Sequence, residues 1–455
     1  MHRPTRRVRL PAAHAITDKI LTNVERFLQI EAVSGLVLLL CAAIALIWAN
    51  SPASDSYVHL WETQLSIGIG TFSLSESLHF IINDGLMTFF FLLVGLEIRR
   101  EIHEGALSEL KAAALPVAAA IGGVIAPAVL FLVLNSDPLL QRGWAVPTAT
   151  DIAFAVGVLA LLGKSIPGSL RIFLLSLAII DDIAAVIIIA VFYSGGLDYS
   201  GLLIGAAALL LVGLMRWIGI GSALAYVVPG ALLWFGLLRS GAHPTLAGVI
   251  LGLLTPVTVR SFRGNPVELV KRAMSTLESR LQQQHTHIDD VREPVRGLRS
   301  AQRELLPAVM RVQIALHQWV AYVVMPLFAL ANAGVNLSAL QLDGALTQSL
   351  VTGVAVALVL GKPIGIMAAS WIAVRLRWCA LPPGVNWSGV LLVGCLGGIG
   401  FTMSIFIAGL AFEDAQLLSA AKLGVLIASL TAGVVGLAFG RYLLVKQRAS
   451  TTQPG

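Results

Sequence analysis

Long apolar segments recur along almost the whole chain and leave little polar sequence between them. They lie at about 33–49, 77–98, 112–134, 143–162, 168–193, 201–217, 221–238, 242–257, 312–335, 348–374, 386–411 and 417–440. A helix needs about 20 residues to cross the hydrocarbon core of a bilayer. Hydrophobic residues make up 57% of the chain and charged residues only 12%. The sequence therefore predicts an all-α polytopic membrane protein with twelve transmembrane helices.

Basic residues test this topology because lysine and arginine are enriched in cytoplasmic connections. All but four of the 31 lysine and arginine residues lie at the two ends of the chain or in every second connection. The exceptions are Arg142 and Arg239 in the opposite connections, and Lys362 and Lys422 within spans. Both termini are therefore predicted to be cytoplasmic. The net charge of +6 follows from this topology, and we expect no nucleic-acid partner.

The spans divide the chain into five parts. We expect a cytoplasmic basic segment at 1–32, spans one to eight at 33–257, a cytoplasmic loop at 258–311, spans nine to twelve at 312–440 and a cytoplasmic tail at 441–455. Apolar residues within 266–281 have the spacing of one helix face, which predicts an amphipathic helix on the lipid surface. In the polar connection 50–76, weak alternation at 71–75 allows a small hairpin that could serve contact in a homodimer.

Two adjacent carboxylates, Asp181 and Asp182, lie near the centre of the span at 168–193. One aspartate at mid-membrane costs about 3 kcal/mol on insertion scales, and a second adds like-charge repulsion. Neighbouring residues on a helix point about 100° apart, so one carboxylate can face a cavity while the other meets a partner helix. Lys362 is the base nearest to mid-membrane and the natural counter-ion. The alternative is that both aspartates are structural.

Two spans carry sequences that favour local unwinding. The fourth holds Pro147, Thr150 and Asp151, and proline is poorly placed inside a continuous helix. The eleventh has four glycines within 394–400, each disfavoured in a helix by about 1 kcal/mol. Half-helix ends carry opposite partial charges. Asp151 could neutralise paired N-terminal ends and Lys362 paired C-terminal ends, unless the glycines merely allow close helix packing.

The two predicted breaks occupy corresponding places in two blocks of three spans. In spans three to five and ten to twelve, the middle span is the broken one, and the blocks begin on opposite sides of the membrane. This layout is typical of inverted-topology repeats, which hold a coupling-ion site at their interface.

Five stretches, in order along the chain, strongly resemble the NhaA-type bacterial sodium/proton antiporters. They are Phe90–Glu97, Ala149–Ala155, Ala178–Ile183, Gly361–Gly365 and Gly398–Phe406. This family is itself among the examples of the inverted-repeat rule. The resemblance covers about residues 25 to 445. It implies twelve helices in the inner membrane, with the fourth and eleventh broken and crossing.

The resemblance also assigns roles to residues. It implies that Asp181 and Asp182 bind Na⁺ or Li⁺ and protons, that Thr150 and Asp151 lie at the crossing, and that Lys362 pairs with Asp181. The resemblance links Glu97 and His243 to structure and pH response, and we assign Glu97, His243 and His317 to pH response or proton entry. For Glu97, an interfacial salt bridge is the alternative. Gln313 and Ile314 stand where an acidic residue and a histidine are expected, which leaves the pH profile open.

The expected function is secondary active exchange of Na⁺ (or Li⁺) for H⁺ across the bacterial inner membrane, in sodium and pH homeostasis. A cation binds the buried carboxylates only when they are ionised, so cation and proton exclude each other. Electrogenic exchange needs a second titrating group, Asp181 or Lys362, and the sequence leaves both open. Partners are then these ions and membrane lipid, with no cofactor.

Two alternatives belong to other classes. A Na⁺-coupled organic solute carrier would need polar or aromatic solute ligands near the crossing, where the sequence offers chiefly carboxylates, Thr150 and Thr402. An intramembrane aspartyl protease would need its two aspartates on separate spans, whereas here they are adjacent. We therefore expect a transporter and not an enzyme.

Overall fold

Most of the described residues are helical. The computed structural model describes residues 31–69, 72–105, 107–163, 166–196, 198–220, 222–257, 271, 274–276, 279, 307–340 and 344–451. The first half contains α2 (Glu31–Ala49), α3 (Ser54–Glu62), α4 (Leu78–Phe80), η1 (Ile81–Leu86), α5 (Met87–Glu104), α6 (Leu110–Leu134), α7 (Pro138–Gln141), η2 (Val146–Thr148), α8 (Ile152–Leu161), α9 (Gly168–Phe192) and α10 (Tyr199–Ile218). The second half contains η3 (Ala223–Tyr226), α11 (Val227–Ser240), α12 (Leu246–Leu254), α15 (Ala308–Trp319), η4 (Val320–Val324), α16 (Met325–Asn332), α17 (Ala345–Val356), η5 (Ala357–Gly361), α18 (Lys362–Arg375), α19 (Trp387–Gly397), α20 (Phe401–Ala411) and α21 (Ala415–Thr451).

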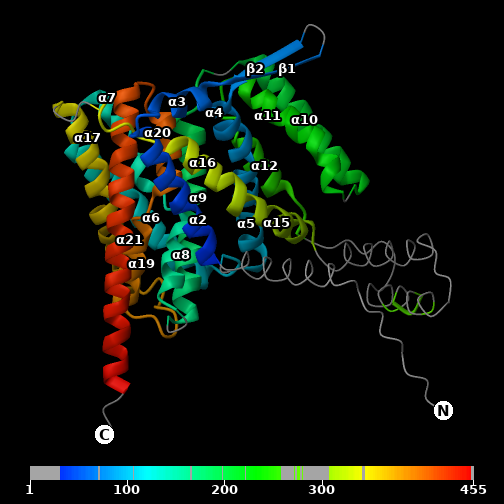
Figure 1. Ribbon diagram of the computed structural model, residues 1–455. Coiled ribbons are helices and arrows are strands. Elements are labelled where there is room, and N and C mark those ends of the chain that lie inside the picture. The colour runs from blue at the N-terminus through cyan, green and yellow to red at the C-terminus, as the bar shows by residue number, and fades with distance from the viewer. Residues whose placement is uncertain are drawn as a thin grey trace, which may run out of the picture.

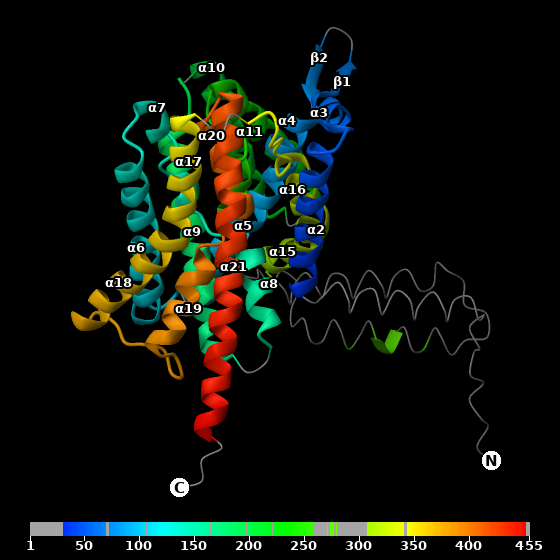
Figure 2. The ribbon, with the colours of Figure 1, turned by 60° about the vertical axis from the view of Figure 1, so that its left-hand side comes forward.

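The helices form a bundle (Figures 1 and 2), and several of its helical stretches are long and apolar enough to cross a membrane. Among the described residues, eight helical stretches meet that test alone, and up to eleven spans result if each of three bent pairs counts as one. The predicted span at 242–257 corresponds to α12, which has only nine residues. The chain is therefore a multi-pass membrane protein.

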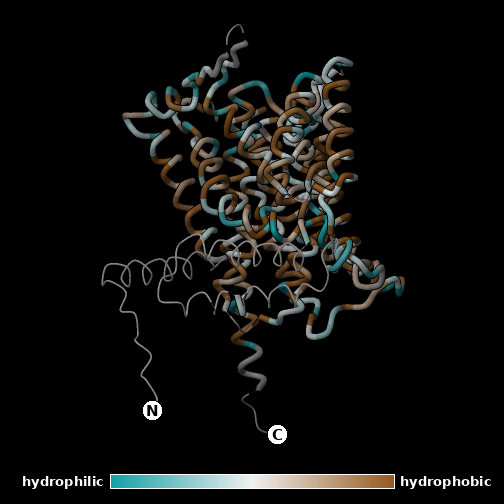
Figure 3. Tube along the Cα trace, turned by 90° about the vertical axis from the view of Figure 1, so that its right-hand side faces the viewer, coloured by the Kyte–Doolittle hydropathy of each residue, from teal (hydrophilic) through white to brown (hydrophobic). Residues whose placement is uncertain are grey.

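The surface of the bundle is apolar, as a lipid environment requires. Hydrophobic residues dominate the length of the helices in Figure 3, and hydrophilic residues are commoner toward their ends. On α10, Leu210 and Trp217 expose 77% and 80% of their surface. Exposure of such side chains would be costly in water and is neutral in lipid.

Close helix contacts are made where glycines remove the side chain. Gly122 of α6 and Gly365 of α18 face each other, and a Cβ atom added to either would collide with the carbonyl oxygen of the other. Small residues at such crossings let helix backbones approach within a membrane. This contact fixes the position of α18, which begins with Lys362.

Within the described ranges, three turns are π-helical: η1, η4 and η5. Pro326 follows η4 by two residues and Pro363 follows η5 by two. A proline has no N–H to donate, and its ring clashes with the carbonyl four residues earlier. That carbonyl belongs to Tyr322 or Val359, inside the π-helical turn in each case, and the wider turn relieves the clash. The η5 turn thus places Lys362 at the point where the span is locally rewound.

One segment departs from the helical bundle. The chain turns by 115° between α2 and α3, and β1 (Gln64–Ile69) then pairs antiparallel with β2 (Phe72–Ser77), with Gln64 opposite Ser77. This hairpin, which the sequence only weakly indicated, projects from the end of the bundle opposite to the last residues of α21 (Figure 1). Tyr57 of α3 anchors the segment, because its hydroxyl donates to the carbonyl of Leu330 at 2.8 Å.

Two predicted regions fall largely outside the described residues. They are the basic segment 1–32 and the loop 258–311 with its amphipathic helix, although Lys271, 274–276 and Ser279 are helical. At the other end of the chain, α21 continues as a helix through the predicted tail as far as Thr451.

Candidate ion-binding site

Asp181 and Asp182 lie on one uninterrupted helix, α9. Strongly apolar residues on both sides keep this helix regular, so the aspartates do not interrupt it. Only 1% of Asp181 and 3% of Asp182 is exposed. Because they are neighbours on a helix, their carboxylates point in different directions, and the structure gives them different surroundings.

Asp181 is paired with the buried lysine of α18. Lys362 Nζ donates to Asp181 Oδ2 at 2.5 Å and to Thr150 Oγ1 at 2.9 Å. The Thr150 hydroxyl also lies 2.7 Å from Asp181 Oδ2. Both partners therefore occupy the same oxygen of Asp181. Its other oxygen, Oδ1, is buried and has no hydrogen-bond partner among the described residues.

Asp151 stands between two half-helices that start at the breaks. Its Oδ1 accepts a hydrogen bond from the backbone amide of Phe154 at 3.0 Å and caps α8. Its Oδ2 accepts from the backbone amide of Thr402 at 3.1 Å, in the first turn of α20, and from the Thr402 hydroxyl at 2.5 Å. One carboxylate thus compensates the positive ends of both half-helices, as expected from the sequence.

The two breaks touch each other through backbone groups. The chain is extended from Ala149 to Asp151, and the amide of Asp151 donates to the carbonyl of Ile399 at 2.7 Å. The Thr150 hydroxyl lies 3.0 Å from the carbonyl of Gly397, the last residue of α19. The structure therefore confirms unwinding of both spans. Lys362 reaches the end of α19 only through Thr150, because its own hydrogen bonds go to Thr150 and Asp181.

Asp182 is the less compensated member of the pair. Its Oδ1 is buried and has no hydrogen-bond partner among the described residues. It interacts electrostatically with three other acids, Glu97, Asp181 and Asp151, and with one base, Lys362. The unpaired oxygens of Asp181 and Asp182 are hard ligands available to a small cation, whose charge would offset this excess of negative charge.

An aromatic cluster lies one helical turn beyond the crossing. Phe406 of α20, four residues after Thr402, has its ring centroid 5.3 Å from that of Phe91, 6.2 Å from that of Phe328 and 5.4 Å from that of His243. The three phenylalanines are buried. These side chains come from four separate parts of the chain and form an apolar layer beside the polar centre.

Glu97, which the sequence placed in a second functional group, lies near the site. It interacts electrostatically with Asp182 and accepts a long hydrogen bond, 3.4 Å, from Gln313 Nε2. The Gln313 Oε1 atom accepts from Arg100 at 3.2 Å. Gln313 thus joins α15 to α5 without adding a charge.

The two histidines of that group lie apart from the aspartate pair. His243 Nε2 is 3.7 Å from Asp84 Oδ1, and its Nδ1 is 2.8 Å from the Thr245 hydroxyl. His243 contacts α20 through the Phe406 ring. His317 is exposed on α15, and the structure does not bring it to the carboxylates.

Several contributors to the site are not evident from charge. They are the carbonyls of Gly397 and Ile399, and the hydroxyl of Ser429, which accepts from the amide of Phe401 at 3.0 Å. The glycine run signalled unwinding, but which carbonyls turn inward is a tertiary property. The available sequence signal for Ser429 was its place as a polar residue in the apolar stretch of α21.

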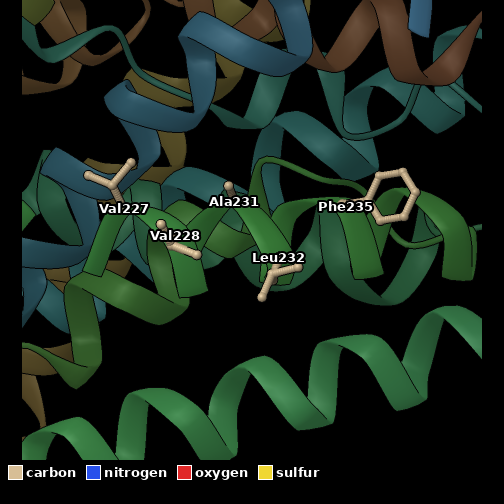
Figure 4. Close-up of a pocket in the computed structure, with 5 residues that line it drawn as sticks. All are labelled: Val227, Val228, Ala231, Leu232 and Phe235. Carbon is tan, nitrogen blue, oxygen red and sulfur yellow. The ribbon is translucent and has the colours of Figure 1, made fainter. Parts of the chain in front are cut away.

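Surface hollows lie elsewhere. One of about 500 Å³ is lined by five residues of α11, shown in Figure 4: Val227, Val228, Ala231, Leu232 and Phe235. Its lining is apolar, and Val227 and Val228 are 60% and 66% exposed on a membrane span. It is a lipid-facing depression and not the ion site. Within the described part of the chain, no three His, Cys, Asp or Glu side chains converge as a metal centre.

Buried carboxylates at the contact of two unwound helices define a secondary cation transporter. The chain belongs to the Na⁺/H⁺ antiporter 1 family, whose model matches residues 25–439. NhaA antiporters are themselves an example from which the inverted-repeat rule was drawn. The chain is therefore a transporter and not an enzyme.

Close relatives support this assignment. The chain is 61% identical over 431 residues to the Na(+)/H(+) antiporter NhaA of Cupriavidus necator, covering 95% of this chain and 92% of the relative. It is equally similar to the NhaA antiporter of a Janthinobacterium species, with 95% of both chains covered. It is 59% identical to the antiporter NhaA 2 of Pseudomonas putida, with 98% of both covered.

Proposed function

We propose that this protein exchanges Na⁺ (or Li⁺) for H⁺ across the bacterial inner membrane, and that it serves sodium and pH homeostasis. One observation carries the proposal: Asp181 and Asp182 are buried where two broken helices meet, each with one oxygen unpaired among the described residues. The relatives are named Na⁺/H⁺ antiporters, which supports the choice of ions.

The mechanism is competition for the aspartate pair. Na⁺ and Li⁺ prefer oxygen ligands and bind the ionised carboxylates. A proton neutralises the same oxygens, so cation and proton exclude each other. If the loaded or protonated site can change its exposure and the empty charged site cannot, each cation is exchanged for protons. The empty charged site cannot change its exposure because that would bury uncompensated negative charge.

Electrogenic exchange needs a second titrating group beside Asp182. The candidates are the two partners in the ion pair, Asp181 and Lys362, which lie 2.5 Å apart. Cation binding at Asp181 competes with the Lys362 ammonium for the same carboxylate, so binding and proton release are coupled.

The architecture that supports this cycle has twelve spans, with α12 as a short one, and both termini in the cytoplasm. The basic residues divide between connections as this topology requires. Spans three to five and ten to twelve form inverted repeats, each with its bent helix pair in the middle. The segments 1–32, 258–311 and 441–455 then share the cytoplasmic side.

Glu97, His243 and His317 form the proposed pH-response group. Glu97 is electrostatically coupled to Asp182, and His243 packs against Phe406 of α20, so both have a physical route to the site. His317 has only its exposed position on α15 in its favour.

The projecting hairpin formed by β1 and β2 offers an edge strand for pairing in a homodimer.

The test uses everted membrane vesicles with an imposed proton gradient that is followed by a fluorescent probe. Added Na⁺ or Li⁺ should collapse the gradient, and vesicles with Asp182→Asn should show no collapse while holding the same amount of inserted protein. Asp198→Asn is the matched control, because Asp198 caps α10 outside the spans. Hydrogen bonds from Ser200 lower the pKa of Asp198, so this variant also removes a negative charge.

Robust exchange by the Asp182→Asn variant would overturn the site assignment. No collapse with any cation at any pH, with the wild-type protein inserted, would overturn the proposed function and favour a solute carrier.

A further inference from the structure

A second hollow opens where α18 ends and α19 begins. It has a volume of about 260 Å³ and is lined by Trp371, Val374, Arg375, Arg377 and Trp387. Figure 2 shows α18 ending on the same side of the molecule as the end of α21. The distribution of basic residues assigns this side to the cytoplasm.

Two arginines bring positive charge to this hollow. The side chains of Arg375 and Arg377 are exposed, and neither has an ion pair or a hydrogen bond to an acidic residue within the described ranges. Guanidinium groups match the geometry of phosphate oxygens. Unpaired arginines around a hollow therefore favour an anionic ligand with a phosphate.

The backbone at Arg377 has a strained, left-handed conformation, and this supports an anionic ligand in the hollow. Arg377 has φ of +61°, and α18 ends in a Schellman pattern: the Trp378 amide donates to the Ala373 carbonyl and the Arg377 amide to the Val374 carbonyl, both at 3.0 Å. The left-handed residue of this motif is usually glycine. An arginine there costs stability, and its side chain lines the hollow.

The neighbouring side chains are those of a membrane interface. Trp371 and Trp378 are 55% and 70% exposed, and tryptophan is enriched at the level of lipid headgroups. Before Trp371, Leu360 of η5 and Ile364 at the start of α18 are 52% and 59% exposed. They share a helix face with Trp371 by spacing and provide an apolar track suited to an acyl chain.

We propose that this hollow binds the headgroup phosphate of an anionic phospholipid from the cytoplasmic leaflet, with its acyl chains along the exposed face of α18. Basic pockets between helices on this side are typical sites for anionic lipids. The proposal does not depend on which cation is exchanged. Because α18 begins with Lys362, the lipid would hold the far end of the helix that carries the site lysine.

The test measures lipid selectivity in the purified, full-length protein. Phosphatidylglycerol and phosphatidylcholine with brominated acyl chains are added in detergent, and quenching of tryptophan fluorescence reports their binding. General lipid contact at other exposed tryptophans does not distinguish the headgroups. The wild-type protein should prefer phosphatidylglycerol, by about fivefold for each arginine.

Three variants separate the site from general charge. Arg375→Gln/Arg377→Gln should lose the preference, whereas Arg441→Gln/Lys446→Gln, which removes two charges from α21, should keep it. Arg377→Gly should raise the melting temperature, since glycine fits the left-handed position, and still reduce the preference. A merely structural arginine would not give these opposite effects.

Other outcomes would overturn the proposal. They are no preference in the wild-type protein, an equal loss of preference in the Arg441→Gln/Lys446→Gln control, or removal of the preference by inorganic phosphate at millimolar concentration. The last result would show that the hollow takes a free anion and not a lipid.

Discussion

The carboxylate of Asp151 accepts two hydrogen bonds from Thr402, a residue 251 positions away in the chain. It caps α8 with its other oxygen. The two half-helices are therefore tied to one negative charge, and displacement of either one disturbs the N-terminal end of the other.

This link can be tested by removing it in steps. Thr402→Val loses the hydroxyl bond but keeps the amide bond, which should cost about 1 kcal/mol. Asp151→Ala leaves two buried helix starts without their acceptor and should cost more, about 1 kcal/mol for each cap. Melting temperatures should fall in that order. Thr431→Val, which removes only a hydroxyl bonded within α21, should be nearly neutral, and an equal effect at Thr402 would contradict the link.

The Lys362–Asp181 pair predicts a non-additive effect on stability. Lys362→Met strands a buried carboxylate and should destabilise the protein by about 3–5 kcal/mol. Adding Asp181→Asn removes the stranded charge and should recover most of that loss, without restoring exchange. Thermal unfolding of both variants in detergent measures the difference. A double variant as unstable as the single one would contradict the pairing.

The glycine contact between α6 and α18 predicts opposite effects for one kind of substitution. Gly365→Ala places a Cβ against the Gly122 carbonyl, so it should destabilise by about 1–3 kcal/mol and reduce exchange by shifting Lys362. Gly409→Ala meets nothing within 4 Å and lies inside α20, so it should stabilise by about 0.5–1 kcal/mol. Melting temperatures that move in the same direction would contradict this account.

Competition between proton and cation predicts the pH dependence of exchange. The apparent KM for Na⁺ should rise as pH falls, because ionised ligands are needed for binding. The rise should be about tenfold per pH unit if one proton competes and up to about a hundredfold if the coupled pair releases two. Initial rates in vesicles across a pH series measure the slope. An apparent KM independent of pH would exclude a shared site.

Much of the site was predictable because charge is rare in this chain. The intramembrane positions of Asp181, Asp182 and Lys362 stand out in apolar sequence, and the structure brings them together. The glycine run at 394–400 and Pro147 predicted the breaks for the same reason: each conflicts with a regular helix.

What the sequence did not show are features set by three-dimensional packing. The inward carbonyls of Gly397 and Ile399 carry no side-chain signal. Nor did the apolar run at 242–257 predict that α12 would have only nine residues, because hydropathy does not report where a helix ends. The π-helical turns were not predicted either, because no sequence pattern marks where a helix winds more widely.

The η5 turn makes the site sensitive to how the helix is wound at a place where no ligand residue lies. A π-helical turn holds about one residue more than an α-helical turn. If 357–361 were rewound as a regular α-helical turn with no residue removed, everything after it would rotate by about 100°. Lys362 would then leave Asp181, and Gly365 would leave Gly122. The π-helical winding before the lysine is thus as much a part of the site as the lysine itself.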